Sequence, residues 1–534
     1  MRKIFGGLSI VFLCALLFPN SSLAEEKQPR VYVSFWFDTE DYILPAADDA
    51  AKRLAEIFTE QGVRATFKIV GEKARVLRDR KRDDVIHALS KHDIGYHAEY
   101  HSVHPTPAEY EQQLGWDEGV KAFMRREGRG VEDLMKIFGV VPSCYGQAGG
   151  SWVPQSYAAL RNWEIPIYLD ETSHVGLDGK PFWYCGVLNV LNLDWRVTRM
   201  GLGGENDFKE GCEQFDEVHK RVFKEGGGLI SIYYHPCEWV HKQFWDGVNF
   251  SRGANPPREE WKLPPQKSPE ETERAFEYFA RYLEHVRTRP NVQLITAREM
   301  GALYPDRAYQ RPFTRNELLQ MASHIQKEVT FLRLGDRAVS AAEILYLLAK
   351  ALTEFHEESR MLSGIPFIER TTVTGGAATV ELIIATFARG TDLKFLYGPS
   401  GTWSEAIQEG TFPWKRWVAA CRDFLEEAED FGRIPPVIWV AGKAVAPEDF
   451  AATLGWVVEH LSEQNLTSWT GTEFPGLREV PLKKGNFTAA KYVAEDGPGL
   501  WGWVIFPPNL RCPKMMELGR LQAWTIKPAI LLQP

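Results

Sequence analysis

Apolar and polar positions along the first 305 residues alternate in a way that predicts short strands separated by amphipathic helices. Short runs rich in β-branched and aromatic residues indicate strands, and apolar residues three and four positions apart indicate helices. The predicted strands are 31–37, 65–70, 94–97, 166–169, 228–234 and 292–296. The predicted helices are 46–61, 82–91, 154–163, 215–224 and 270–287. This alternation is typical of an α/β domain with a parallel sheet, either open or closed into a barrel.

The pattern changes after residue 305, and the rest of the chain, 306–534, is expected to form a mixed α+β domain. It contains a weak internal repeat, in which an apolar run and a glycine, Gly335 or Gly442, precede an acidic residue near a helix start. The two copies are 331–356 and 437–462. They resemble the strand–turn–helix units of pseudomurein-binding repeats, which implies cell-wall binding. Two copies of a common supersecondary unit are the alternative.

The first residues have the features of a secretory signal peptide. Two basic residues precede an apolar run over 8–18, and the small residues Ser22 and Ala24 mark a cleavage site after Ala24. An uncleaved membrane anchor is the alternative, but the run is shorter than the roughly 20 residues that a spanning helix needs. The predicted divisions are a signal peptide (1–24) and a barrel domain (25–305). We therefore expect a mature protein that is secreted or lies in the periplasm or cell envelope.

The charge balance narrows the range of partners. The formal net charge of the 534 residues is −9, and loss of Arg2 and Lys3 with the leader makes it −11. An acidic protein of this kind is not expected to bind nucleic acid or an anionic membrane. No later segment is apolar enough to span a bilayer. Six cysteines follow the leader, but no CxxC spacing among them marks a zinc site.

Three carboxylates, Asp38, Glu40 and Asp41, follow the first predicted strand. In parallel α/β folds the reactive side chains lie at the carboxyl ends of the strands. One carboxylate at such a position could bind a metal while another stays free as a general base. Acidic residues are also common in surface turns and at helix N-termini, so the motif is weak by itself.

Histidines cluster just after the predicted strand 94–97. His97 and His101 are four residues apart, so one helical turn would bring both imidazoles to the same side, where they could share a cation. His104 could replace one of them. Three of the 13 histidines lie within eight residues, which makes a purely structural role in a loop the poorer interpretation. A carboxylate with two imidazoles suits Zn²⁺ or a similar first-row metal.

Three further segments carry candidate residues. A glycine-rich turn contains Gln147 and ends in Trp152. Its backbone N–H groups could hold an oxyanion, and Trp152 could form a platform for a sugar ring. Asp170 and His235 each follow a predicted strand. An Asp beside this His would orient it and keep it protonated, as a general acid requires, and Asp194 is the weaker candidate for that partner.

Taken in this order, the segments resemble the polysaccharide deacetylase family of carbohydrate esterases over residues 31 to about 305. The resemblance implies an irregular (β/α) barrel, with Asp38 as the catalytic base, His235 as the catalytic acid and Asp170 as a carboxylate that tunes the site. The metal ligands that it implies are Asp41, His97 and His101. The substrate-binding residues that it implies are Gln147 and Trp152. The implied metal is Zn²⁺, with Co²⁺ or Ni²⁺ as alternatives.

The activity implied by the resemblance is the removal of N-acetyl groups from an extracellular polysaccharide or cell-wall glycan. In that reaction the metal polarises the acetyl carbonyl and lowers the pKa of a water molecule. Asp38 then takes the proton of the water, and His235 protonates the departing amine.

Two departures from the family pattern leave other interpretations open. Glu40 stays an alternative ligand because two residues separate Asp38 from Asp41, and the arginine of the family's third motif is missing, with Gln147 expected in its place. A non-catalytic protein that binds a glycan or the cell wall is one alternative function. A metal amidohydrolase that acts on a small amide is the other.

Overall fold

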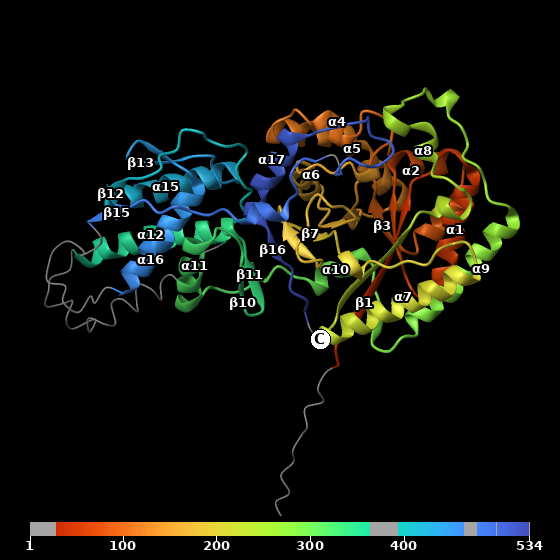
Figure 1. Cartoon of the computed structure of the whole chain (residues 1–534), viewed down its shortest axis with the longest axis horizontal. Coiled ribbons are helices and arrows are strands. Elements are labelled where there is room, and N and C mark those ends of the chain that lie inside the picture. The colour runs from red at the N-terminus through yellow and green to blue at the C-terminus, as the bar shows by residue number, and fades with distance from the viewer. Residues whose placement is uncertain (1–27, 364–392, 464–477, 498, 533–534) are drawn as a thin grey trace, which may run out of the picture.

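The computed structural model describes residues 28–363, 393–463, 478–497 and 499–532 (Figure 1). The predicted signal peptide, 1–24, lies outside these residues. Within the described part of the chain, no helix combines the length and the apolar character that crossing a bilayer requires.

The N-terminal half forms a curled, mostly parallel sheet with helices packed around it (Figure 1). The strands are β1 (Val31–Thr39), β2 (Thr66–Ile69), β3 (Asp93–Tyr96), β4 (Cys144–Tyr145), β5 (Ile167–Leu169), β6 (Phe182–Tyr184), β7 (Val187–Val190), β8 (Gly228–Tyr234), β9 (Val292–Leu294) and β16 (Lys527–Pro528). The helices are α1 (Pro45–Glu60), α2 (Gly71–Asp79), α3 (Asp83–Leu89), α4 (Pro107–Glu111), α5 (Trp116–Phe138), α6 (Ser156–Asn162), α7 (Glu205–Lys224), α8 (Trp245–Asn249), α9 (Pro269–Arg287) and α10 (Ala297–Leu303).

The strand order is β16-β6-β7-β5-β4-β3-β2-β1-β8, with β9 also paired to β1. Among the described strands of this sheet, β6 and β16 are the ones that run antiparallel to their neighbours. An isolated parallel bridge between Val197 and Ser231 joins the chain that follows β7 to β8, at the opposite end of the strand order. The sheet therefore curls toward closure. The predicted class, an α/β irregular barrel followed by a mixed α+β part, is confirmed.

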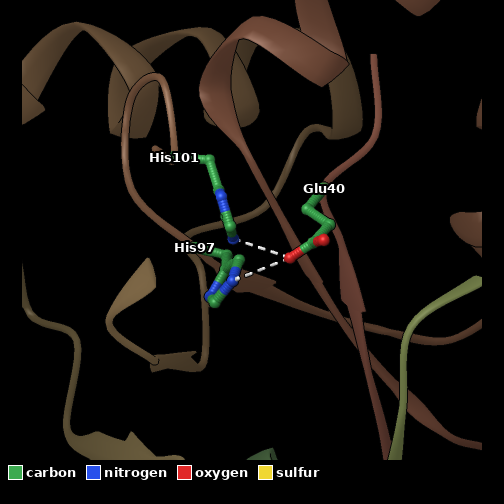
Figure 2. A group of neighbouring side chains, drawn as sticks. All are labelled: Glu40, His97 and His101. Carbon is green, nitrogen blue, oxygen red and sulfur yellow. Dashed lines mark ion pairs between the residues drawn. The ribbon is translucent and has the colours of Figure 1, made fainter. Parts of the chain in front are cut away.

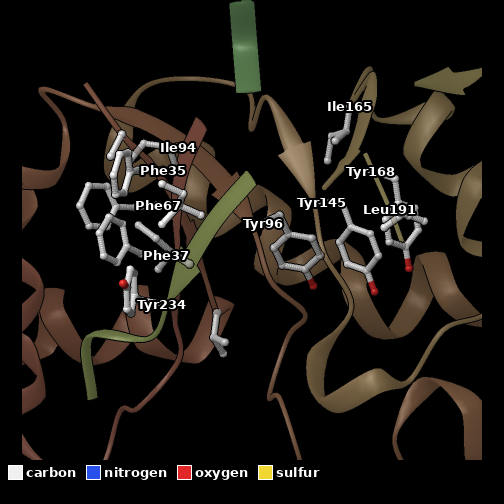
Figure 3. Close-up of a cluster of buried hydrophobic side chains, with 14 of the residues drawn as sticks. Phe35, Phe37, Phe67, Ile94, Tyr96, Tyr145, Ile165, Tyr168, Leu191 and Tyr234 are labelled. Atoms are coloured by element: carbon white, nitrogen blue, oxygen red, sulfur yellow. The ribbon is translucent and has the colours of Figure 1, made fainter. Parts of the chain in front are cut away.

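Side chains of β1 alternate between two buried layers, as the twofold period of a strand requires. The odd-numbered Phe35 and Phe37 pack beneath the helices, whereas the even-numbered Tyr32 and Trp36 lie in the cluster that fills the barrel interior. Figure 3 shows part of the layer beneath the helices, where Tyr96, Tyr145 and Tyr168 stand in a row on β3, β4 and β5. Because Asp38 is also even-numbered, its side chain follows Trp36 on the interior face.

Helix α1 illustrates how the sequence builds the outer layer. Pro45 takes the first helical position, where its missing N–H group leaves no hydrogen bond unmade. Just before it, the Asp41 carboxylate accepts hydrogen bonds from the backbone N–H groups of Ile43 and Leu44. Small and apolar residues then recur three and four positions apart and face the sheet. These buried residues include Ala47, Ala50, Ala51, Leu54, Ala55 and Phe58.

The C-terminal half has its own apolar core. Its elements are α11 (Arg315–Lys327), β10 (Leu332–Leu334), β11 (Arg337–Val339), α12 (Ala341–Ser363), β12 (Thr411–Pro413), α15 (Trp414–Phe431), β13 (Ile438–Val440), β14 (Lys443–Val445), α16 (Pro447–Glu463) and β15 (Glu479–Pro481). Each copy of the predicted repeat forms an antiparallel hairpin, with Gly335 or Gly442 at a positive φ in its turn, followed by a helix. Among these helices, α11 packs on α16 and α12 packs on α15.

The chain then returns to the barrel. Val493, Trp501 and Ile505 pack in the barrel core, α17 (Pro513–Gln522) follows, and β16 pairs with β6 at the edge of the sheet (Figure 1). The predicted division into 25–305 and 306–534 therefore leaves out this return, because the edge of the first sheet comes from the last described residues.

Candidate metal and catalytic site

The carboxyl ends of β1, β2 and β5 meet around one buried lysine. Asp38 and Lys68 are directly paired in the register of β1 and β2, on the interior face. The Lys68 ammonium lies 2.9 Å from Oδ1 of Asp38 and 2.9 Å from Oδ2 of Asp170, and it donates a hydrogen bond to the Leu169 carbonyl. The ring of Trp36 lies below it, 4.1 Å from the nitrogen. A fully buried cation thus joins the predicted base to the predicted tuning carboxylate.

Two glycines make room for this lysine. Lys68 pairs in register with Gly95 of β3, and a Cβ added there would lie 2.8 Å from Cγ of Lys68. At Gly146, just after β4, an added Cβ would lie 2.0 Å from Nζ of Lys68 and 2.4 Å from the Asp170 carboxylate. The side chain can therefore cross two strands to reach Asp170 only because both positions lack a side chain.

The pKa values of the two carboxyl groups are shifted in opposite directions. Burial alone would raise the pKa of Asp38, but His97, Lys68 and His235 together lower it below its usual value. Burial raises the pKa of Asp170 despite the nearby Lys68. Asp38 is therefore the group held as a carboxylate, which is the form that a general base requires.

Glu40, His97 and His101 form a second cluster (Figure 2). Nε2 of His101 lies 2.6 Å from Oε2 of Glu40, and Nε2 of His97 lies 3.8 Å from the same oxygen. All three residues are buried. Burial would raise the pKa of Glu40, but the imidazoles of His101 and His235 hold it well below its usual range.

The donor set of this cluster fits a first-row metal. His97 shares a hydrogen bond with the Gly146 carbonyl through Nδ1, and because a carbonyl can only accept, Nδ1 carries the proton. Nδ1 of His101 lies 2.7 Å from the Ser102 hydroxyl, which itself donates to Asp246, so this Nδ1 is also the donor. Each Nε2 is then the ring nitrogen nearest to Glu40, and it could bind a metal ion after losing its proton. Two imidazoles oriented in this way beside one carboxylate are typical of a zinc site.

A second trio of potential ligands, Asp38, His97 and Asp170, also lies close together. The Lys68 ammonium already contacts both of its carboxylates. A divalent ion there would face a buried positive charge at contact distance, so Glu40, His97 and His101 are the better metal site.

His235 follows β8 on the other side of Asp38. Its Nε2 lies 3.6 Å from Oδ2 of Asp38, and its Nδ1 lies 2.9 Å from Glu238, which in turn binds Arg199. Burial would lower the pKa of His235, but the carboxylates of Glu40 and Glu238 raise it to about 9. The imidazole is therefore protonated near neutral pH, as a general acid must be.

The structure brings together Asp38, His97, His101, Asp170 and His235. The predicted pairing of His235 with Asp170 is not present. The carboxylate bound to His235 is that of Glu238, because Asp170 is bound to Lys68. Asp194, the weaker candidate for that partner, is exposed at the start of a 3-10 helix, Asp194–Arg196.

Asp41, the predicted metal ligand, lies apart from the histidine pair. One of its oxygens accepts the N–H groups before α1, and the other lies 3.5 Å from His241. Glu40, the alternative ligand, holds the place predicted for Asp41. His104, the other alternative, is paired with Glu109 at 2.7 Å.

The two predicted substrate-binding residues are both buried. Trp152 is fully enclosed, stacked on His174 with its indole N–H donated to Tyr157, so it offers no face to a sugar. Gln147 is 2% exposed and neither of its amide atoms has a hydrogen-bond partner among the described residues. The backbone N–H groups of Ser151 and Trp152, expected to hold an oxyanion, donate to the carbonyls of Ala148 and Gly150.

A cavity of about 310 Å³ is lined by neighbours of His235 but not by His235 itself. Its walls include Glu238 and Phe244, and the Phe244 ring lies 4.8 Å from the ring of His235. Arg199, Lys242 and Lys267 also line it. Glu238 and Phe244 thus separate this cavity from the predicted general acid.

Sequence reasoning missed Lys68, Glu238, Asp246 and Trp503. Two of them carry a local signal. Lys68 is a charged residue within the buried strand β2, and Glu238 lies three residues after His235, at the spacing of a capping box. Asp246 and Trp503 carry none, because they come from a short helix and from the returning C-terminal segment.

No family model matches this sequence, and no curated protein sequence matches it. Solved structures that match include a Mycobacterium smegmatis protein assigned to the polysaccharide deacetylases, at 13% identity and a TM-score of 0.34, covering 52% of this chain and 91% of that one. The PuuE allantoinase matches at 13% identity and a TM-score of 0.34, over 52% and 93%. A family 4 carbohydrate esterase from Streptomyces lividans, in complex with acetate, matches at 12% and 0.25, over 49% and 91%.

Proposed function

We propose that the chain is an exported, metal-dependent hydrolase that removes N-acetyl groups from a cell-surface or extracellular polysaccharide. The observation that carries the proposal is the convergence of three functions at one end of the barrel. Glu40, His97 and His101 offer a metal site, Asp38 lies beside it as a carboxylate, and protonated His235 lies 3.6 Å from Asp38. Hydrolysis of an amide requires these three functions together.

Glu40, His97 and His101 would hold the metal, with Zn²⁺ as the expected ion. When bound, such an ion polarises a carbonyl oxygen and lowers the pKa of a neighbouring water molecule. Asp38 accepts the proton of the attacking water, since Lys68 and the two imidazoles keep it ionised. His235 donates a proton to the departing amine, and Glu238 holds its ring in place through Nδ1. The products would be acetate and a free amino sugar.

Metal content and acetate release test this proposal together. We expect wild-type protein to bind one Zn²⁺ and to release acetate from N-acetylated glucosamine oligomers. Asp38→Asn should keep the metal and lose the release, and His101→Gln should lose both. His104→Gln is the matched control, because His104 is paired with Glu109 outside the cluster. Wild-type protein that holds Zn²⁺ but releases no acetate from any acetylated glycan would overturn the proposal.

The enclosure of the site favours a second candidate, hydrolysis of a small amide. Asp38, Glu40, His97 and His101 are each 5% exposed or less, and a small substrate fits an enclosed site more readily than a long polymer does. Turnover of small cyclic amides, without acetate release from glycans, would favour this candidate.

A further inference from the structure

The returning C-terminal segment lies against the candidate site. At Gly149, which has a φ of 54°, an added Cβ would lie 2.7 Å from Ile505 and 3.0 Å from the ring of Trp503. On the other side, the backbone N–H groups of Arg252 and Gly253 donate to the carbonyls of Val504 and Ile505. The segment around Trp503 is thus fixed between two loops of the barrel.

Trp503 is connected to the metal cluster by a continuous chain of hydrogen bonds. Its indole N–H donates to Oδ2 of Asp246 at 3.0 Å, and the Ser102 hydroxyl donates to the same oxygen at 3.3 Å. The Ser102 oxygen then accepts from Nδ1 of His101 at 2.7 Å. The Asp246 carboxylate therefore sets the direction of the Ser102 hydroxyl, and through it the tautomer and orientation of His101. Partners of this kind typically change metal affinity 10- to 100-fold when they are lost.

The Trp503 ring has a second property. It is 41% exposed, whereas Trp152, the tryptophan that the sequence suggested as a platform, is enclosed. The ring lies 6.1 Å from Phe244, and Phe244 lies 4.8 Å from His235, so a row of rings leads from solvent to the general acid. An exposed indole beside a reactive centre suits stacking against the apolar face of a sugar ring.

We propose that Trp503 has two roles: its indole N–H orients His101 through Asp246 and Ser102, and its exposed ring binds a sugar unit of the substrate. Trp503 is a positioning residue in the first role and a substrate-binding residue in the second. The second role rests on the proposed deacetylase function, whereas the first rests only on the binding of a metal by Glu40, His97 and His101.

Two substitutions separate the roles. Trp503→Phe keeps a ring and removes the N–H donor, so Zn²⁺ affinity should fall about tenfold while KM for the glycan changes little. Trp503→Ala removes both, so KM should also rise about five- to tenfold. Trp439→Phe and Trp439→Ala are matched controls, because Trp439 is 51% exposed on β13 in the C-terminal half. Zn²⁺ affinity is measured by competition with a chelator, independently of activity.

A double variant tests the chain of hydrogen bonds itself. Trp503 reaches His101 only through Asp246 and Ser102, so its effect should largely disappear once Ser102 is replaced. The fold-loss of Zn²⁺ affinity in Ser102→Ala/Trp503→Phe should therefore be smaller than the product of the two single fold-losses. Unchanged Zn²⁺ affinity in Trp503→Phe would overturn the positioning role, and an unchanged KM in Trp503→Ala would overturn the binding role. Wild-type protein that binds Zn²⁺ without releasing acetate would instead overturn the proposed function, and the affinity measurements would still decide the positioning role.

Discussion

The ammonium nitrogen of Lys68 lies 2.9 Å from Oδ1 of Asp38, with the lysine side chain fully buried. The same nitrogen contacts Asp170 at 2.9 Å. The sequence lacks the arginine that the family resemblance leads one to expect near Gln147, and the positive charge comes instead from the neighbouring strand β2. The charge environment of Asp38 is therefore built from a different part of the chain.

Replacement of Lys68 should be costly. Lys68→Met leaves two buried carboxylates without their cation, and removal of one partner of a buried ion pair typically lowers the free energy of unfolding by about 3–5 kcal/mol. Urea denaturation measures the loss. The double variant Lys68→Met with Asp170→Asn removes one of the stranded charges, so it should recover part of the stability. A double variant no more stable than Lys68→Met would contradict this account.

Gly146 should not tolerate a side chain. In Gly146→Ala the new Cβ would displace the Lys68 ammonium or the Asp170 carboxylate, and overpacking of this kind usually costs about 1–3 kcal/mol. Both the stability of Gly146→Ala and its rate of acetate release should be lower than those of the wild type. Gly301→Ala is the control, because an added Cβ at Gly301 in α10 meets no atom within 4 Å. Equal thermal unfolding temperatures for the two variants would argue against the tight packing described here.

Glu40 and Asp41 can be distinguished as ligands by Zn²⁺ affinity. Glu40→Gln removes the negative charge that both histidines face, so the affinity for Zn²⁺ should fall about 100-fold. Asp41→Asn should bind Zn²⁺ as the wild type does, since its amide oxygen can still accept the N–H groups of Ile43 and Leu44. Isothermal titration measures both variants. The opposite order of affinities would restore Asp41 as the ligand.

Glu111, which lies outside the metal cluster, makes the free energy of unfolding depend on pH. It is fully buried, neither carboxyl oxygen has a hydrogen-bond partner among the described residues, and burial raises its pKa to about 8 from 4.5. The native state therefore binds this proton more tightly than the unfolded state, so the contribution to stability is present below about pH 4.5 and is lost as the pH rises toward 8.

Glu111→Gln should remove this loss. At pH 8 we expect it to be more stable than the wild type by about 2–4 kcal/mol, with the difference shrinking toward pH 4.5. Denaturant unfolding at several pH values measures the difference. Glu118→Gln, at an exposed position on α5, is the control. A difference that does not vary with pH would show that the Glu111 carboxyl does not titrate as described.

Local pattern was enough to predict six strands of the sheet, the histidine pair and the class of fold, because strand and helix periods are encoded in neighbouring residues. It did not predict β4, β6, β7 and β16, which are only two to four residues long. The twofold period of an extended chain also distinguishes Glu40 from Asp41. Asp38 and Glu40 lie on one face of an extended chain, whereas Asp41 lies on the opposite face. Glu40 therefore faces the histidines. The role of Trp503 could not be predicted, because nothing near it in the sequence indicates that the chain returns to the barrel.

That return has a consequence for how the protein is made. The edge strand β16 and the segment around Trp503 come from the last described residues, and they complete a sheet whose first strand begins at Val31. During synthesis from the N-terminus, β6 would be paired with β7 on one side only until residues 527–528 have emerged from the ribosome. A product truncated before β16 would carry that open edge, the kind of surface on which chains associate with one another. Synthesis as far as β16 is thus the condition both for a protected sheet edge and for the contact of Trp503 with Asp246.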